Sequence, residues 1–178
     1  VQLQGYTDSS ITTNQAFTFP PSGGQLVCYQ QGNWTPTLSA GVTNTQNQYQ
    51  SQWSRVGQIV TLYGRLKWDG VNSAAFISVD GLPYYSPADN ADGAVFVGPV
   101  FTERQTGGVN ESAANNMVCY ALSSGIQVYF ATSSSTYAQV SYDDFGLNTG
   151  ATGPGFVFSI SYRTEDTDWQ PLNGATLT

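Results

Sequence analysis

The sequence contains no histidine, and this absence removes several kinds of catalytic and metal site. A Ser-His-Asp or Cys-His mechanism needs an imidazole as its general base. Zinc sites are built mainly from histidine and closely spaced cysteines, but the two cysteines of this chain do not form a Cys-x-x-Cys pair. The sequence therefore predicts no hydrolase of the common kind, no metal ligand set and no cofactor.

Charge is also scarce, since charged residues make up only 10% of the 178-residue chain. Twelve acidic residues against five basic ones give a net charge of −7, which disfavours binding to a phosphate backbone and hence to nucleic acid. Disordered chains combine low hydrophobicity with high charge, and this chain has 40% hydrophobic residues. We expect a folded protein with a largely neutral, polar surface.

Long apolar runs are missing as well: none approaches the roughly 20 residues that a membrane-spanning helix needs, so no membrane insertion is predicted. Helical periodicity is nearly absent. Apolar and polar residues instead alternate in short segments separated by Gly, Pro, Asn, Asp and Ser, a pattern typical of antiparallel sheets. The length suits one domain with a core of its own.

The clearest alternation runs from Ile59 to Trp68 and from Phe156 to Arg163. In each segment one face is apolar and the other polar, which predicts strands with one buried face. The expected buried residues are Val60, Leu62, Gly64, Leu66 and Trp68, then Phe156, Phe158, Ile160 and Tyr162. Further strands are expected at Ala16–Phe19, Gln25–Tyr29, Trp34–Ser39, Ala74–Val79, Gly93–Phe101, Met117–Leu122, Ile126–Ala131 and Ala138–Tyr142. About ten short strands predict an all-β, antiparallel, jelly-roll-like β-sandwich.

The stretch from Gly32 to Pro83 contains an ordered set of motifs. It runs from Trp34-Thr35-Pro36-Thr37-Leu38 through a Tyr/Gln-rich segment to Trp53-Ser54-Arg55-Val56-Gly57, a strand and Gly81-Leu82-Pro83. This order resembles a module found at the distal, receptor-binding ends of bacteriophage tail fibres and tailspikes. Ile160-Ser161-Tyr162-Arg163-Thr164 is similar to the strand on which such modules often end, so the resemblance covers residues 32–164.

The resemblance implies a homotrimeric virion protein, assembled in the host bacterial cytoplasm, that contacts other virion proteins and a host cell-surface glycan and catalyses nothing. It divides the chain into an N-terminal strand or junction segment (residues 1–31), a β-sandwich knob (32–164) and a C-terminal surface tail (165–178) pinned by Trp169. Cys28 and Cys119 lie in strand-like contexts. A disulfide between them is possible, but cytoplasmic assembly favours two buried free thiols.

Aromatic side chains are the candidate ligand-binding residues, because their rings stack on sugars while neighbouring amides bind hydroxyl groups. The candidates are Tyr84, Tyr85, Trp68, Trp169 and Tyr137. Each has a structural alternative: Trp68 alternates with Leu66 onto the expected core face, Tyr137 begins a strand, and Trp169 anchors the tail. Adjacent Tyr84 and Tyr85 cannot both enter the core from an extended chain, so at least one should be exposed.

The motif residues Trp34, Trp53 and Arg55 are the candidates for the subunit interface. Trp34 and Trp53 are equally compatible with a place in the core. Arg55 is expected to stack on an aromatic ring or to pair with a carboxylate across a subunit boundary. The alternative for Arg55 is an ordinary surface arginine before a turn.

Two other functions remain open at this stage. A capsid cement or decoration protein could staple coat subunits by adding a terminal segment as a β-strand. A carbohydrate-active enzyme would need two carboxylates at catalytic separation. The acids that could supply them are Asp69, Asp80, Glu103, Glu111, Asp143 and Asp144. Several lie in turn-like contexts, where a carboxylate usually caps backbone donors rather than binding calcium or catalysing.

Overall fold

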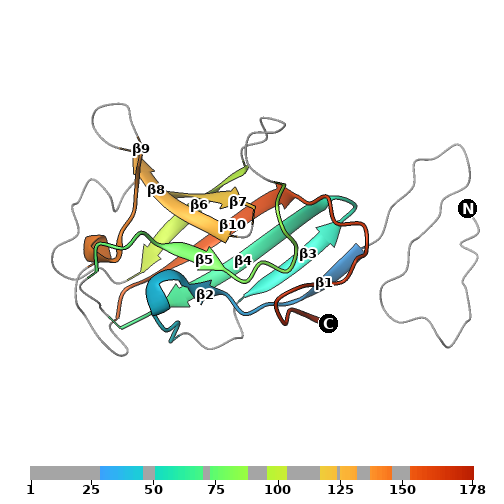
Figure 1. The fold of residues 1–178 in the computed structure, drawn as a ribbon, viewed down its shortest axis with the longest axis horizontal. Helices are drawn as coiled ribbons and strands as arrows, with labels where there is room; N and C mark the ends of the chain where they lie inside the picture. Colours follow the sequence, from blue (N-terminus) through green and yellow to red (C-terminus); the bar gives the residue numbers. More distant parts are fainter. Residues whose placement is uncertain are drawn as a thin grey trace, which may run out of the picture.

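The structure, a computed structural model, describes residues 29–45, 51–69, 73–87, 96–103, 117–123, 125–131, 137–145 and 153–178. Within these ranges the chain forms one antiparallel sheet of eleven strands, two short 3-10 turns and no α-helix (Figure 1). The strands are β1 (Tyr29–Asn33), β2 (Thr37–Leu38), β3 (Gln52–Val56), β4 (Ile59–Lys67), β5 (Ser78–Asp80), β6 (Phe96–Glu103), β7 (Met117–Leu122), β8 (Gly125–Ala131), β9 (Tyr137–Gln139), β10 (Gly155–Arg163) and β11 (Thr176–Leu177). The predicted all-β antiparallel class is confirmed.

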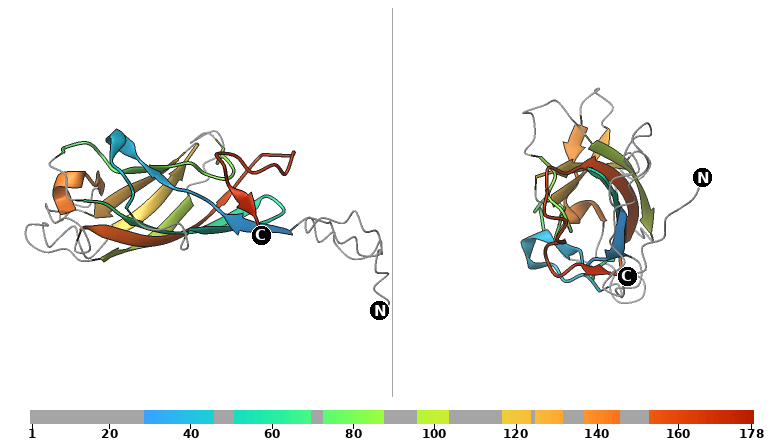
Figure 2. Two further views of the ribbon diagram at one scale, coloured as in Figure 1. Left: turned by 90° about the horizontal axis from the view of Figure 1, so that it is seen from below. Right: turned by 90° about the vertical axis from the view of Figure 1, so that its right-hand side faces the viewer.

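The strands follow the order β11-β1-β3-β4-β10-β6-β7-β8-β5-β2, and β9 also pairs with β8. Strand β6 belongs to both halves of this sheet, because Val100 to Glu103 pair with β10 while Phe96 to Pro99 pair with β7. Proline has no backbone N–H to give to a ladder, so Pro99 suits the point where the pairing changes. The sheet curls strongly around its interior (Figure 2).

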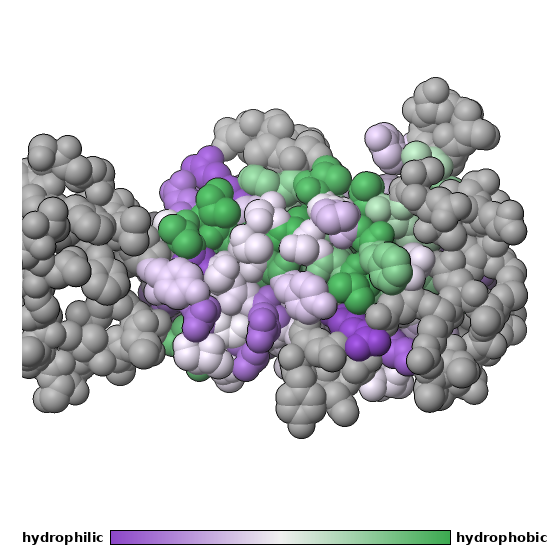
Figure 3. All heavy atoms as spheres, turned by 180° about the vertical axis from the view of Figure 1, so that it is seen from behind, coloured by the Kyte–Doolittle hydropathy of each residue, from purple (hydrophilic) through white to green (hydrophobic). Residues whose placement is uncertain are grey.

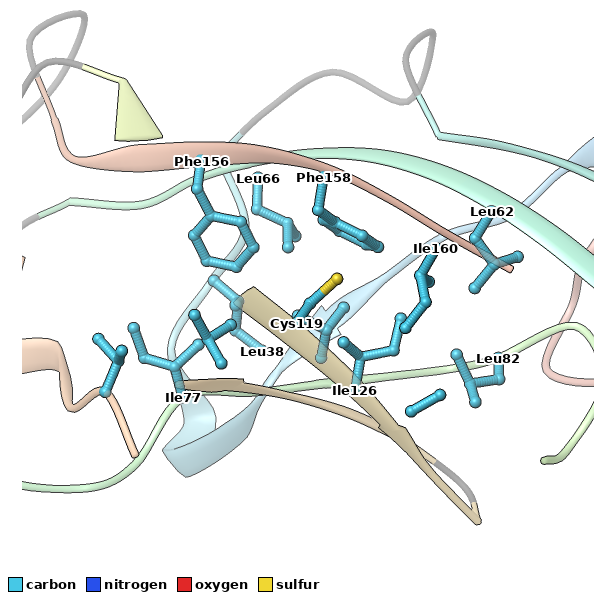
Figure 4. Packing of buried hydrophobic residues seen from close by; sticks show 14 of the residues in the cluster. Leu38, Leu62, Leu66, Ile77, Leu82, Cys119, Ile126, Phe156, Phe158 and Ile160 are labelled. Atoms are coloured by element: carbon cyan, nitrogen blue, oxygen red, sulfur yellow. The ribbon is translucent and has the colours of Figure 1, made fainter. Parts of the chain in front are cut away.

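The core fills the concave side of the curl. Side chains from β4 and β10 point across it toward Cys119 of β7 and Ile126 of β8, with Leu38 and Ile77 beside them (Figure 4). The alternation predicted for β4 and β10 is confirmed, since all nine expected core positions are buried and the two strands pair from Gly155↔Lys67 to Arg163↔Ile59.

One end of the core is an aromatic cluster around Trp68, which is fully buried. Its indole meets the rings of Tyr142, Phe145 and Phe156 edge-on, with centroids 5.7, 5.0 and 5.8 Å away. Tyr142 and Phe145 belong to the 3-10 turn Tyr142–Phe145 that follows β9. Aromatic pairs favour this edge-to-face geometry.

Several expected elements differ from the structure. Strand β3 was not predicted, because its alternation of Trp53 and Arg55 follows a Gln-rich run that resembles a loop. The strand expected at Trp34–Ser39 is reduced to β2, since the backbone turns at Ser39. Ala16–Phe19 and most of Gln25–Tyr29 lie outside the described residues, and the expected boundary between residues 31 and 32 falls inside β1.

The C-terminal strap, defined here as Thr164–Thr178, closes the open side of the curled sheet. Leu172 N–H donates to the Pro83 carbonyl at 2.8 Å, and the Asn173 side chain donates to the Leu82 carbonyl at 2.8 Å. The strap then ends in β11, which pairs with β1 at Gly32 and Asn33. The segment expected as a surface tail therefore adds a strand to the sheet.

Candidate functional site

The structure separates the aromatic residues predicted to bind a ligand. Trp68 and Tyr84 are fully buried, so neither ring offers a face to a ligand. Tyr85 is 47% exposed and Tyr137 is 70% exposed. The prediction that at least one of the adjacent tyrosines is exposed is confirmed, because Tyr84 points inward and Tyr85 outward.

Tyr85 and Tyr137 do not form one site. Ser86, next to Tyr85, donates its N–H to the carbonyl of Ser123, which lies two residues before the first residue of β8. Tyr137 lies opposite Ala131 at the far end of the same strand. The seven residues of β8 span about 20 Å, so the two tyrosines lie too far apart to grip one sugar unit.

The motif residues expected at a subunit interface point into the chain itself. Trp34 and Trp53 are each 2% exposed, and their indole N–H groups donate to the carbonyls of Tyr63 at 3.2 Å and Asn33 at 3.3 Å. In a single chain neither residue has a surface for a neighbouring subunit. Both tryptophans belong to the buried core of the sheet.

Arg55 is 1% exposed, so it is not an ordinary surface arginine. The expected carboxylate and aromatic partners are both present, but they lie in the same chain. Its Nη1 donates to Asp166 Oδ1 at 2.8 Å, and its guanidinium carbon lies 3.7 Å from the centroid of the Trp169 ring and 4.4 Å from that of Tyr84. The predicted anchoring role of Trp169 rests on this contact. Burial raises the pKa of Tyr84, and Arg55 opposes that rise.

Two of the candidate acidic residues, Asp144 and Asp80, accept hydrogen bonds from serines close to them in the sequence. Asp144 Oδ2 accepts the N–H of Ser141 at 2.7 Å and its hydroxyl at 2.9 Å. Asp80 Oδ1 accepts the Ser78 hydroxyl at 3.1 Å. In the described part of the chain no three His, Cys, Asp or Glu side chains gather as metal ligands. Among the same residues, no helix is both long enough and apolar enough to cross a bilayer.

The convex, outer face of β1, β3, β4 and β10 carries two rows of uncharged polar side chains, here called the polar rows. The register gives Gln31, Ser54, Thr61 and Ser161 in one row and Asn33, Gln52, Tyr63 and Ser159 in the next. Thr61 and Ser161 share a hydrogen bond of 2.8 Å between their hydroxyls, and Tyr63 is 43% exposed. Arg163 and Arg65 lie in the rows on either side. The result is a neutral strip of hydroxyl and amide groups around an accessible ring.

An apolar band crosses the neighbouring part of the outer face. It consists of Val97, Pro99 and Phe101 of β6, Val118 and Tyr120 of β7, and Val157 of β10. Phe101 is 71% exposed and Val97 is 53% exposed, and Val97 lies opposite Tyr120 in the ladder. Figure 3, which views the molecule from this side, shows hydrophobic side chains gathered beside paler polar ones. Contiguous exposed apolar groups mark interaction surfaces.

Sequence reasoning missed these outer-face residues as candidates. The alternation in β4 placed Tyr63 on the exposed side, and that placement is confirmed. Its importance comes from polar neighbours in β3 and β10, which are distant in sequence and meet it only through the register. The signal available in the sequence was an aromatic residue, Tyr63, on the polar side of a strand with alternating apolar and polar residues.

No protein-family model matches the chain, and no curated protein matches it. The outer face of the described strands is the part of the surface from which we infer a function. Its chemistry suits contact with another molecule: one part is apolar, and the other is neutral and rich in hydroxyl and amide groups.

Proposed function

We propose that this chain is a bacteriophage virion protein that forms the tip of a tail fibre or tailspike and binds a host cell-surface glycan. Two observations support the proposal. The motifs in residues 32–164 resemble those of receptor-binding fibre modules, and the helix-poor sheet displays a neutral face with an accessible ring. The second observation carries the proposal, because it provides the chemistry of the contact.

The polar rows match the needs of a neutral sugar chain. The Tyr63 ring offers an apolar face on which a sugar ring can stack. Gln31 and Gln52 present amide groups, which donate and accept, and Ser159 presents a hydroxyl group, which does both. Rows two residues apart along a strand are separated by about 7 Å, so an extended glycan can follow the strands and meet both rows.

The same proposal assigns the apolar band to contact between copies of the chain in a homotrimer with jelly-roll-type subunits. An exposed apolar side chain such as Phe101 is stabilised by burial in a subunit contact. Several copies of a weak glycan site on one particle give avidity without tight single sites. The protein acts by binding, within the virion, and other virion proteins hold it in place.

The direct test is binding of the purified full chain to an array of bacterial lipopolysaccharide, capsular and teichoic-acid glycans. A fibre-tip protein binds a restricted set of these glycans and leaves their length unchanged after incubation. Shortened glycan would contradict the proposal in favour of a carbohydrate-active enzyme. Absence of glycan binding, together with binding to expanded capsids, would contradict it in favour of a capsid cement protein.

A further inference from the structure

Besides its bonds to Leu82 and Pro83 and its ladder with β1, the C-terminal strap makes a group of contacts centred on Arg55. Arg55 Nη1 donates to the Asp166 carboxylate at 2.8 Å, and Arg55 Nη2 donates to the Asp166 carbonyl. Trp169 covers the guanidinium with its ring, and its carbonyl accepts the Gln30 amide at 2.9 Å. Three contacts to Arg55 and one to Gln30 thus fix an acidic and an aromatic residue of the strap.

The receiving residues, Gln30, Arg55 and Tyr84, form what is called here the slot. Each is held by contacts that do not involve the strap. Arg55 Nε donates to the Gly57 carbonyl at 2.9 Å, and Tyr84 packs edge-on against Trp53 with centroids 5.4 Å apart. The hydroxyl of Tyr84 donates to Gln30 Oε1. The slot is therefore organised by the sheet and its adjoining loop.

The strap and the slot are complementary in charge. Residues 164–178 include Glu165, Asp166 and Asp168 and contain no lysine or arginine. Arg55 is buried, so its charge needs a carboxylate partner, and Asp166 is the one that the structure gives it. An acidic residue followed by an aromatic at the third position after it, Asp-x-x-Trp, satisfies both the guanidinium charge and its flat face.

The distal end of the strap is held by a short ladder. Strand β11 has two residues, and both are exposed. Its close approach depends on Gly32, where a Cβ would lie 1.6 Å from the Thr176 carbonyl oxygen. Trp169 and Asn173 have φ of 55° and 54°, in the left-handed region that strains non-glycine residues. A two-residue ladder beyond strained turns is the kind of segment that opens locally while the sheet stays folded.

We propose that the slot is a recognition site for an acidic-aromatic Asp-x-x-Trp segment, and that the strap of a second copy of this chain, including its strand β11, occupies it by strand exchange. A strap supplied by another copy makes the same contacts as the chain's own strap. A strap bound to its own chain and a strap bound to a second copy therefore differ mainly in which sheet the strap is covalently connected to. The attached strap acts as a competitor at an effective concentration on the order of millimolar, so exchange needs copies held close together.

The test uses a fluorescently labelled peptide of residues 164–178 and two full-length proteins, the wild type and the strap variant Asp166→Ala/Trp169→Ala. The variant weakens its own strap but leaves the slot intact. Fluorescence anisotropy should show the peptide binding the variant at least about tenfold more tightly than the wild type. A peptide carrying the same two alanines is the matched control and should bind neither protein.

Equal binding of the labelled peptide to both proteins, or binding to neither, would overturn the proposal. Amide hydrogen exchange in β4 and β10 checks that the strap variant is folded. If it is not, the wild type decides the question: millimolar unlabelled peptide should accelerate exchange in residues 164–178 and leave β4 unchanged. Unchanged exchange in the strap would then contradict strand exchange.

Discussion

Gly64 of β4 lies directly opposite Phe158 of β10, and a Cβ at Gly64 would be only 2.5 Å from Phe158 Cε1. The glycine makes room for the neighbouring ring in a fully packed core. Gly64→Ala should therefore push the ring out of place and destabilise the fold by about 1–3 kcal/mol, the usual cost of overpacking. Chemical denaturation measures this, and a variant as stable as the wild type would show that the ring has another place to go.

Arg55→Lys keeps the charge but loses the flat fork that spans Asp166 and stacks on Trp169. We expect a loss of about 2 kcal/mol in the free energy of unfolding. The matched control is Arg163→Lys, because Arg163 Nε donates to the exposed Gln58 side chain at 3.2 Å. That variant should stay within about 0.5 kcal/mol of wild type. Equal effects of the two substitutions would contradict a special role for Arg55.

Cys119 should resist thiol reagents in the native protein. It is fully buried beneath Gly98, and burial raises the pKa of its thiol to about 12. A thiol reagent at about pH 8 should label it only after unfolding in guanidinium, since the thiolate is the reactive form. The measurement uses a Cys28→Ser variant, so that one thiol is counted. Rapid labelling of the folded variant would contradict the described burial.

The same thiol predicts a dependence of stability on alkaline pH. Its pKa is higher in the folded than in the unfolded protein, so above about pH 9 the unfolded chain binds fewer protons. The free energy of unfolding should then fall as the pH rises, and this group alone contributes up to about 1.4 kcal/mol per pH unit. The free energy of unfolding is measured against pH for Cys28→Ser and for Cys28→Ser/Cys119→Ala, and the difference between the two slopes is the contribution of Cys119. A slope that is identical with and without Cys119 would contradict it.

The strands with strict alternation could be predicted from the sequence, and the reason is local. In β4 and β10 every second side chain is apolar, and the core follows directly from period-two geometry. Strand β3 was missed because Gln52, Ser54 and Arg55 resemble loop residues. The burial of Arg55 depends on Asp166 and Trp169, which return to it from near the other end of the chain.

The candidate site shows the same limit. Aromatic type alone drew attention to Trp68 and Tyr84, whose rings are needed by the core. Tyr63 gains its surroundings from Gln52 and Ser159, and that pairing depends on register between strands distant in sequence. Burial and cross-strand pairing are tertiary properties. A choice of aromatic residues based on their local sequence could therefore not identify the outer face around Tyr63.

The apolar band should control self-association. Val97→Ser/Phe101→Ser removes two exposed apolar side chains, so the folded subunit should stay within about 0.5 kcal/mol of wild type in stability. The proposed trimer should dissociate to monomers in sedimentation analysis, because its contact loses apolar area. Phe76→Ser is the control, since Phe76 is 56% exposed outside the band. A trimer that survives the double substitution would exclude the band as its interface.

The most direct measurement of the account is the affinity of the full chain for the glycan selected on the array, compared between Tyr63→Ala and Tyr137→Ala. Both tyrosines are exposed, but only Tyr63 lies within the polar rows. The account predicts that Tyr63→Ala weakens binding about tenfold or more, while Tyr137→Ala leaves it unchanged. Unchanged affinity in Tyr63→Ala would contradict a glycan site on the outer face.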